Sequence, residues 1–166
     1  DFLVSFSLDI TRTVPESDQN NLARQLANFN CLRITEMMYH PSDGSDLEYI
    51  ELQNIGADEL NITGVRLGDG IAFTFSAMTL AAGEYVVIVN NTPVFQARYG
   101  MDIRIAGEYE GNLDNGGETI LLQLPAPFEA AILRIEYSDA WYPSTDGQGY
   151  ALVIRDVLAP RDAWNR

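Results

Sequence analysis

Hydrophobic and polar residues alternate with a period of two over most of the chain from residue 32 onward, which is the pattern of β-strands with one buried face. Clusters of glycine, asparagine, aspartate and proline separate the alternating runs, as in antiparallel sandwiches. Two of these clusters, Gly68-Asp69-Gly70 and Asn115-Gly116-Gly117, tolerate positive φ and predict hairpin turns. The sequence therefore predicts an all-β antiparallel sandwich of about eight or nine strands. The runs assigned to strands are 32–39, 47–54, 65–67, 72–75, 85–90, 119–124, 130–137 and 149–155.

Two helices are predicted beside these strands. The run 85–89 is apolar on both faces, which is expected of a central strand that is covered on both sides. A helix predicted over residues 93–99 follows this run, and we expect it to cover the outer face of the strand. Upstream, Leu22, Leu26 and Phe29 recur at helical spacing, which predicts one short amphipathic helix over residues 16–29.

These elements divide the chain into three parts. Residues 1–31 are expected to form an N-terminal appendage, in which a strand over residues 2–10 precedes the helix. Residues 32–158 form the sandwich, and residues 159–166 form a C-terminal tail. Because the strand pattern is complete from Leu32 onward, a deletion of residues 1–31 is expected to leave the remainder folded. The abrupt start at Asp1 leads us to expect a piece of a larger protein, with residues 1–31 as the remnant of a preceding domain or linker.

The charge of the chain restricts its partners. It carries 24 acidic and 10 basic residues, for a formal net charge of −14, and every basic residue is an arginine. Such a field repels phosphate backbones and anionic lipid headgroups, so nucleic acids and bare membrane surfaces are poor partners. No apolar run approaches the roughly 20 residues of a membrane span, so membrane insertion is not expected. The expected partners are other proteins or neighbouring domains of the parent chain, and the oligomeric state stays open.

Short segments of defined composition follow one another in order along the sandwich: ITEMMYHP (34–41), EYIELQNIG (48–56), LNITG (60–64), FTF (73–75), LAAGEYVVI (80–88), GNLDNGGE (111–118) and WYPSTDGQGYAL (141–152). In this order they resemble the lamin tail domain family in its bacterial form. The resemblance implies an immunoglobulin-like sandwich, known from the tail of nuclear lamins and from bacterial exported and cell-surface proteins. It therefore implies an extracellular or cell-surface location. No coiled-coil heptads precede the domain, so filament formation as in lamins is not expected.

Two carboxylates, Glu36 and Glu48, stand among apolar strand residues. If the pleat is regular, Glu36 shares a face with Ile34 and Glu48 shares a face with Ile50. Both acids are then expected to point toward the core.

A buried carboxylate needs a partner, so each acid is expected to accept backbone N–H groups or to meet an arginine such as Arg134 or Arg155. The favoured role of Glu36 and Glu48 is therefore structural. Two convergent carboxylates also suit an acid and base pair, as glycosidases require, so a hydrolase that uses them is the less favoured alternative.

Other residues with reactive side chains stand alone. His40 is the only histidine, and Ser42 and Ser45 nearby lack the strand-turn-helix context of a serine hydrolase, so no triad is expected. Cys31 is the only cysteine and has no metal-binding neighbour, so it is expected to be a small buried apolar residue. No dinucleotide, nucleotide or zinc-protease motif occurs, so no cofactor is expected.

Loop residues supply the last candidates. Trp141 and Tyr142 are candidate contact aromatics for a sugar or peptide, although the favoured role of Trp141 is to close one end of the sandwich. Trp164 is balanced between the two roles. A weak calcium site is a further candidate, with aspartates in two loops. These aspartates are Asp43, Asp46, Asp139 and Asp146.

The leading hypothesis is a non-catalytic structural or binding module of a larger exported or cell-surface protein, which mediates protein interaction or domain presentation. A calcium-dependent adhesion or carbohydrate-binding module is the alternative, and it requires acidic loops that meet around a cation or an aromatic shelf. The hydrolase is the third hypothesis, and it requires Glu36 and Glu48 to line one open pocket. Fold alone does not decide among the three.

Overall fold

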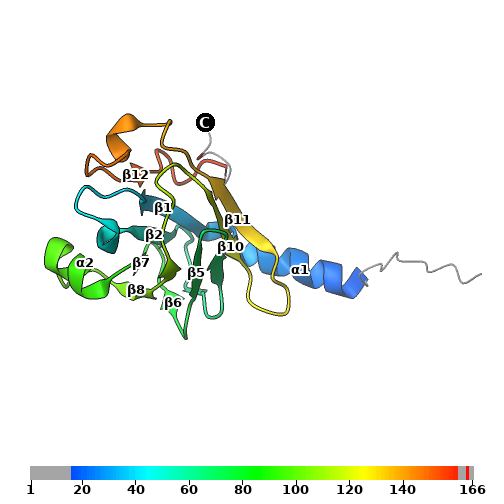
Figure 1. Ribbon diagram of the computed structural model, residues 1–166. Helices are drawn as coiled ribbons and strands as arrows, with labels where there is room; N and C mark the ends of the chain where they lie inside the picture. The colour runs from blue at the N-terminus through cyan, green and yellow to red at the C-terminus, as the bar shows by residue number, and fades with distance from the viewer. Residues whose placement is uncertain (1–15, 161–163, 165–166) are drawn as a thin grey trace, which may run out of the picture.

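Two stacked five-stranded sheets form the body of the molecule. The computed structural model describes residues 16–160 and 164 (Figure 1). The first sheet has the order β12 (Leu152–Val153), β1 (Leu32–Met38), β2 (Tyr49–Asn54), β7 (Tyr85–Val89) and β8 (Ile105–Glu108). The second has the order β11 (Ala131–Glu136), β10 (Thr119–Gln123), β4 (Arg66–Gly68), β5 (Ile71–Thr74) and β9 (Glu110–Gly111). A small ribbon pairs β3 (Leu60–Asn61) with β6 (Thr79–Leu80).

This arrangement is an immunoglobulin-like β-sandwich, which confirms the expected fold class. Within the part of the chain that the structure describes, the strand pairs are antiparallel except β7 with β8, which are parallel. Each of the eight expected runs contains or overlaps a strand, whereas β3, β6, β8 and β9 were not predicted. Three of these four strands have only two residues, which is too short for an alternating pattern to show.

The core lies between the two sheets and is built from alternate residues of their strands. From the first sheet, Ile50 and Leu52 of β2 and Val86 and Ile88 of β7 face inward. The intervening residues of β7, Val87 and Val89, lie in a second buried cluster on the outer face. Both faces of β7 are therefore covered, as its apolar sequence predicted.

Helix α2 (Thr92–Tyr99) covers the outer face of the first sheet. The Asn91 side chain caps it by accepting a hydrogen bond from the Val94 N–H at 3.2 Å. Phe95 is buried against Val87 and Val89, so the expected position of this helix is confirmed. Short 3-10 helices occupy Ser45–Leu47 and Pro143–Thr145.

Helix α1 (Glu16–Asn28) projects from the sandwich near β10 and β11 (Figure 1). A 3-10 turn, Phe29–Cys31, follows it and brings Phe29 into the core, where its side chain is only 6% exposed. Leu22 and Leu26 pack partly buried against the same core. A boundary at residue 32 therefore leaves one core side chain in the appendage. The strand predicted over residues 2–10 lies outside the described residues. No described helix has both the length and the apolar character needed to cross a membrane.

The two predicted hairpin turns differ in outcome. Asp69 and Gly70, with φ of 56° and 104°, connect the paired strands β4 and β5, as predicted. The turn at 115–117 is not a hairpin, because β9 before it pairs with β5 and β10 after it pairs with β4 and β11. Gly117 is nevertheless required there, because an added Cβ would lie 2.4 Å from the Tyr137 carbonyl oxygen.

Candidate functional site

Glu36 lies on the outer face of the first sheet. The pairing of β1 with β2 shifts between Ile34 and Glu36, and Thr35 is the extra residue of a β-bulge. Ile34 therefore faces the core opposite Leu52, whereas Glu36 faces outward opposite Glu51. The expectation that Glu36 points into the core is wrong, because it assumed a regular pleat and a bulge moves every following side chain to the other face.

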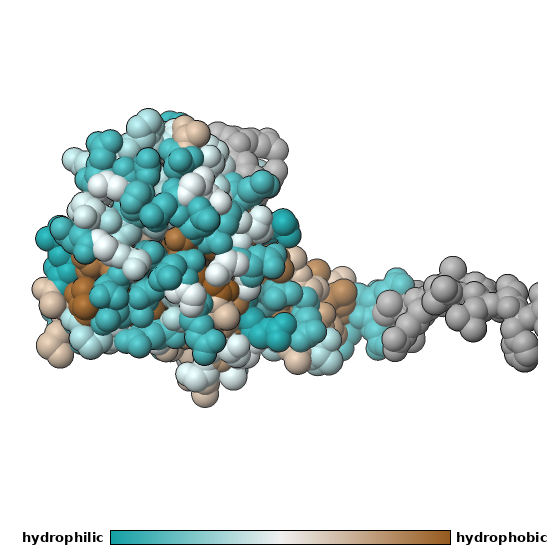
Figure 2. Space-filling view, in the orientation of Figure 1, coloured by the Kyte–Doolittle hydropathy of each residue, from teal (hydrophilic) through white to brown (hydrophobic). Residues whose placement is uncertain are grey.

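A groove of about 500 Å³ opens on this outer face, beside α2 and the segment 102–104 that follows it. In the view of Figure 2, apolar surface shows beside α2 within a mostly hydrophilic face. The walls of the groove come from β1, β2, β7, α2 and the segment before β8. This outer-face groove is lined by Glu36, Tyr49, Glu51, Glu84, Tyr85, Phe95, Tyr99, Asp102 and Arg104, among others.

The floor of the outer-face groove is aromatic. The Tyr49 ring packs edge-on against Phe95 and Tyr99, with ring centroids 5.4 and 5.6 Å away. Its hydroxyl donates a hydrogen bond to the Glu36 carboxylate. Burial, and then the bond to Glu36, raise the pKa of Tyr49, so the phenol stays protonated and remains a donor.

Glu51 stands beside Glu36 on the neighbouring strand. Its carboxylate accepts a hydrogen bond from the Thr35 hydroxyl at 2.6 Å. Burial raises the pKa of Glu51, the bond from Thr35 opposes this rise, and the negative charge of Glu36 adds to it. The groove therefore holds two neighbouring carboxylates, each fixed by one neutral donor.

Arg104, the cationic residue in the groove wall, already has partners. Arg104 forms an ion pair with Glu84 and donates to the Thr79 carbonyl oxygen at 2.9 Å. The Ala81 N–H, followed by the hydrogen bond from Arg104, lowers the pKa of Glu84. Among the described residues, no other cationic side chain lines the groove.

Glu48 is buried on the core side of the first sheet, in the predicted orientation. It is 2% exposed and accepts hydrogen bonds from the Tyr109 hydroxyl at 2.9 Å and the Leu113 N–H at 2.8 Å. Burial raises the pKa of Glu48, and the two hydrogen bonds oppose that rise.

The arginines expected to meet these acids do not do so. Arg134 instead lies 3.7 Å from the Asp69 carboxylate, and Arg155 is exposed. Because Glu36 and Glu48 lie on opposite faces of the first sheet, they do not form the acid and base pair that the hydrolase hypothesis requires.

The four aspartates proposed for calcium do not converge. Asp43 and Asp46 are exposed in the loop after β1, and Asp139 is half-buried beyond β11. Asp146 instead contacts His40, with Nδ1 and Oδ1 2.6 Å apart. Within residues 16–160 and 164, no group of three or more His, Cys, Asp or Glu side chains is placed to hold a metal ion.

The candidate contact aromatics lie near the edge strand β12. Trp141 is partly buried against the core, and Tyr142 is exposed. The Trp164 indole N–H donates to the Ile34 carbonyl oxygen at 3.2 Å, so Trp164 is held in the core. Tyr142 belongs to an exposed group, the β12 patch, composed of Tyr142, Tyr150, Val153 and Leu158.

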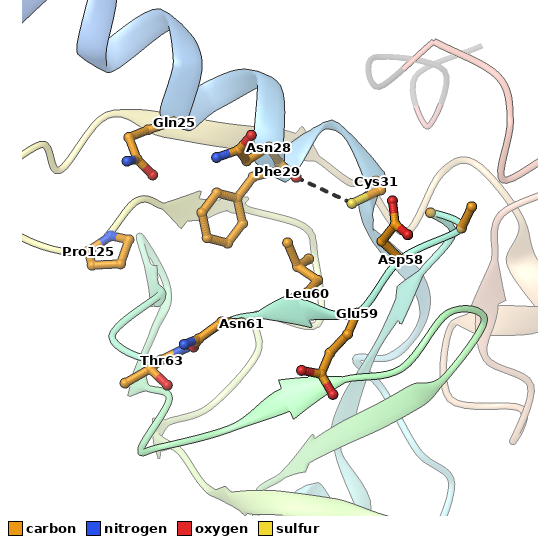
Figure 3. Close-up of a pocket in the computed structure, with 12 residues that line it drawn as sticks. Gln25, Asn28, Phe29, Cys31, Asp58, Glu59, Leu60, Asn61, Thr63 and Pro125 are labelled. Carbon is orange, nitrogen blue, oxygen red and sulfur yellow. Dashed lines mark hydrogen bonds between the residues drawn. The ribbon is translucent and has the colours of Figure 1, made fainter.

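Another pocket, of about 580 Å³, lies between the end of α1 and β3 (Figure 3). The Cys31 thiol at its edge donates to the Asn28 carbonyl oxygen at 3.3 Å. Cys31, expected to be a small buried apolar residue, is half-buried and packs against the core. In Figure 3 the Phe29 ring lies between Pro125 and Leu60, and the polar lining consists of scattered amides and rim carboxylates without a focused charge.

Comparison with known proteins bears on the part of the chain that forms these sites. The family model described as Lamin Tail Domain matches residues 26–138. This match includes the end of α1, the buried Phe29, every strand from β1 to β11 and the whole outer-face groove. The β12 patch lies beyond it. No curated protein matches the chain.

Proposed function

Because the chain belongs to the lamin tail domain family of immunoglobulin-like domains, we propose that it is a non-catalytic binding module whose recognition surface is the outer-face groove. The partner is a segment of another protein or of a neighbouring domain. The proposal also places the module in a larger exported or cell-surface protein, and the support for that part is the family resemblance alone. The complete reading frame tests it, because an export signal or a surface anchor in the same frame is the expected finding.

The proposal rests on the positions at which large apolar side chains remain exposed. Among the described residues, the exposed large hydrophobic side chains fall into two groups, and one of them is the β12 patch. In the other group, Tyr85 at 49%, Tyr99 at 37% and Ile103 line the outer-face groove, and Met101 lies between Tyr99 and Ile103 in the sequence. Contiguous exposed apolar surface is uncommon on monomeric proteins, and tyrosine and methionine are enriched at interfaces.

Shape and chemistry favour the groove over the β12 patch. A ligand site is usually concave, mainly apolar and equipped with a few convergent polar groups. The groove has this character, with an aromatic floor and the carboxylates of Glu36 and Glu51 at its side. The groove also lies inside residues 26–138, which the family model matches, whereas the β12 patch does not.

Selection from a random peptide library displayed on phage tests the proposal. We expect selected peptides to bind the wild-type chain and to lose at least about tenfold in affinity, about 1.4 kcal/mol, on a Tyr85→Ser/Tyr99→Ser variant. The matched control is Tyr142→Ser/Tyr150→Ser, which removes two exposed tyrosines from the β12 patch and is expected to bind as the wild type does. Peptides whose binding follows the control pair, or a library that yields no binder, would contradict the proposed surface.

A further inference from the structure

The outer-face groove holds negative charge that the fold does not compensate. Its described lining carries the carboxylates of Glu36, Glu51, Glu84 and Asp102 and the guanidinium of Arg104. That guanidinium is paired with Glu84. Among the described residues, neither Glu36 nor Glu51 takes part in an ion pair.

The placement of these two carboxylates lowers the stability of the first sheet. Glu36 and Glu51 are register partners on β1 and β2, and directly opposed like charges destabilise an antiparallel pair. The Thr35 bulge creates this opposition, because a regular strand would direct Glu36 to the other face. Hydrogen bonds from Tyr49 and Thr35 then hold both carboxylates in place. A cation between them would remove the repulsion.

The aromatic floor suits the same kind of ligand. Cations are attracted to the faces of aromatic rings, and desolvation strengthens the attraction. The Tyr49, Phe95 and Tyr99 rings form one packed group beside the carboxylates, and Tyr85 stands exposed at the mouth. A lysine or arginine side chain has an aliphatic stem that packs on apolar surface and a charged end that reaches the acids.

We infer that the outer-face groove binds a basic segment of a partner protein and places a lysine or arginine side chain between Glu36 and Glu51. This inference rests on the proposed function, because it names the chemistry of the ligand for the same groove. The net charge of −14 over the whole chain adds long-range attraction for such a segment. The chain contains no lysine, so a second copy offers only arginine, and two copies that each carry a net charge of −14 repel each other.

Binding of a cation should also depend on pH. A bound cation favours the ionised form of Glu51, whose pKa in the free chain is raised by burial and by Glu36. The ligand must therefore displace a proton at low pH, and affinity is expected to rise as pH rises through the raised pKa of Glu51. Affinity should also fall as ionic strength rises.

Short acetylated and amidated peptides, alike except for a central Lys, Arg, Gln or Glu, test the inference by calorimetry at fixed ionic strength. We expect the Lys or the Arg peptide to bind at least about tenfold more tightly than the Gln peptide, and the Glu peptide to bind most weakly. A Glu36→Gln/Glu51→Gln variant should lose this preference. Glu110→Gln, an exposed acid on β9, is the control for a lower net charge and should keep it.

The outcomes separate the two proposals. Equal affinity for all four peptides, with loss of binding on Tyr85→Ser/Tyr99→Ser, would overturn the basic ligand and leave the groove as the recognition surface. Peptides that bind the wild type and the tyrosine variant equally would overturn both. The carboxylate variant keeps hydrogen-bond acceptors for Tyr49 and Thr35, and its melting temperature establishes that it is folded.

Discussion

Glu36 and Glu51 lie directly opposite each other on β1 and β2, and among the described residues neither has a cationic partner. The charges of this pair oppose folding of the free chain, whereas the hydrogen bonds from Tyr49 and Thr35 support it. A substitution that removes one of these charges should therefore stabilise the free protein and weaken its binding of a basic ligand.

Removing either charge of this pair should stabilise the free protein. Glu51→Gln keeps an acceptor for Thr35 and removes the repulsion, so we expect a gain of about 0.2–1 kcal/mol in the free energy of unfolding. In a double-mutant cycle with Glu36→Gln, the double variant should gain less than the sum of the single variants, because either change alone relieves the same repulsion. Urea unfolding measures each free energy, with Glu110→Gln as control. A gain that is additive would show that the two carboxylates do not interact.

Glu48 should behave in the opposite way. Glu48→Ala leaves the Tyr109 hydroxyl and the Leu113 N–H buried without their acceptor, and each unsatisfied group costs about 1–3 kcal/mol. Denaturant unfolding should show this loss, while Glu110→Ala stays within about 0.5 kcal/mol of the wild type. A midpoint for Glu48→Ala equal to that of the control would mean that water reaches these donors.

Stability should fall as pH rises from about 4.3, the ordinary pKa of a glutamate, toward neutral. Burial raises the pKa values of Glu48, Glu51 and Glu118 above that value, so the folded chain binds more protons than the unfolded chain in this range. The stability that these protonated groups contribute is complete below the unfolded pKa and is lost as pH rises through the folded pKa. Urea unfolding across this range measures the slope.

A variant with glutamine at all three positions provides the comparison for this slope. It should show a flatter dependence on pH, because the three groups no longer titrate. A wild-type stability that rises with pH in the same range would contradict the direction of these shifts.

Phe29 tests the N-terminal limit of the domain. Phe29→Ala removes a ring that is 6% exposed in the core and should lower the free energy of unfolding by about 3–5 kcal/mol. Asn30→Ala, at an exposed neighbouring position, should have little effect. The deletion of residues 1–31 removes the same ring, so we expect it to destabilise the remainder, contrary to the prediction from the strand pattern. A deletion as stable as the full chain would show that the domain begins at Leu32.

The period-two pattern was sufficient for the sandwich and for the position of α2, because both follow from which faces must be buried. The pattern Leu32, Ile34, Glu36 and Met38 reads as one regular face, and nothing in it marks the bulge at Thr35. The adjacent Met37 and Met38 are buried on opposite faces of the sheet. Two apolar residues in succession were the one local sign that β1 is buried on both faces and not on one.

The residues that meet at Glu48 and at the groove could not be predicted from the sequence, for a different reason. Tyr109 and Leu113 lie 61 and 65 residues beyond Glu48, and Glu51, Tyr85 and Tyr99 reach the groove from three different elements. Such meetings depend on sheet order, which alternation does not specify. The sequence gives no sign of the exposed Tyr85, because an aromatic residue at the start of an apolar strand is expected to be buried, whereas Tyr85 is exposed in the structure.

The most direct test of the recognition surface is the position of the residues that respond to a basic peptide. The wild-type chain, labelled with ¹⁵N, is titrated with the Lys-centred peptide while backbone amide shifts are followed by NMR. We predict that amides of residues 84–87 and 99–104 move along one saturating curve and that those of the β12 patch do not move. Saturating shifts confined to the β12 patch, or shifts spread over the acidic surface without saturation, would contradict the assignment of the outer-face groove.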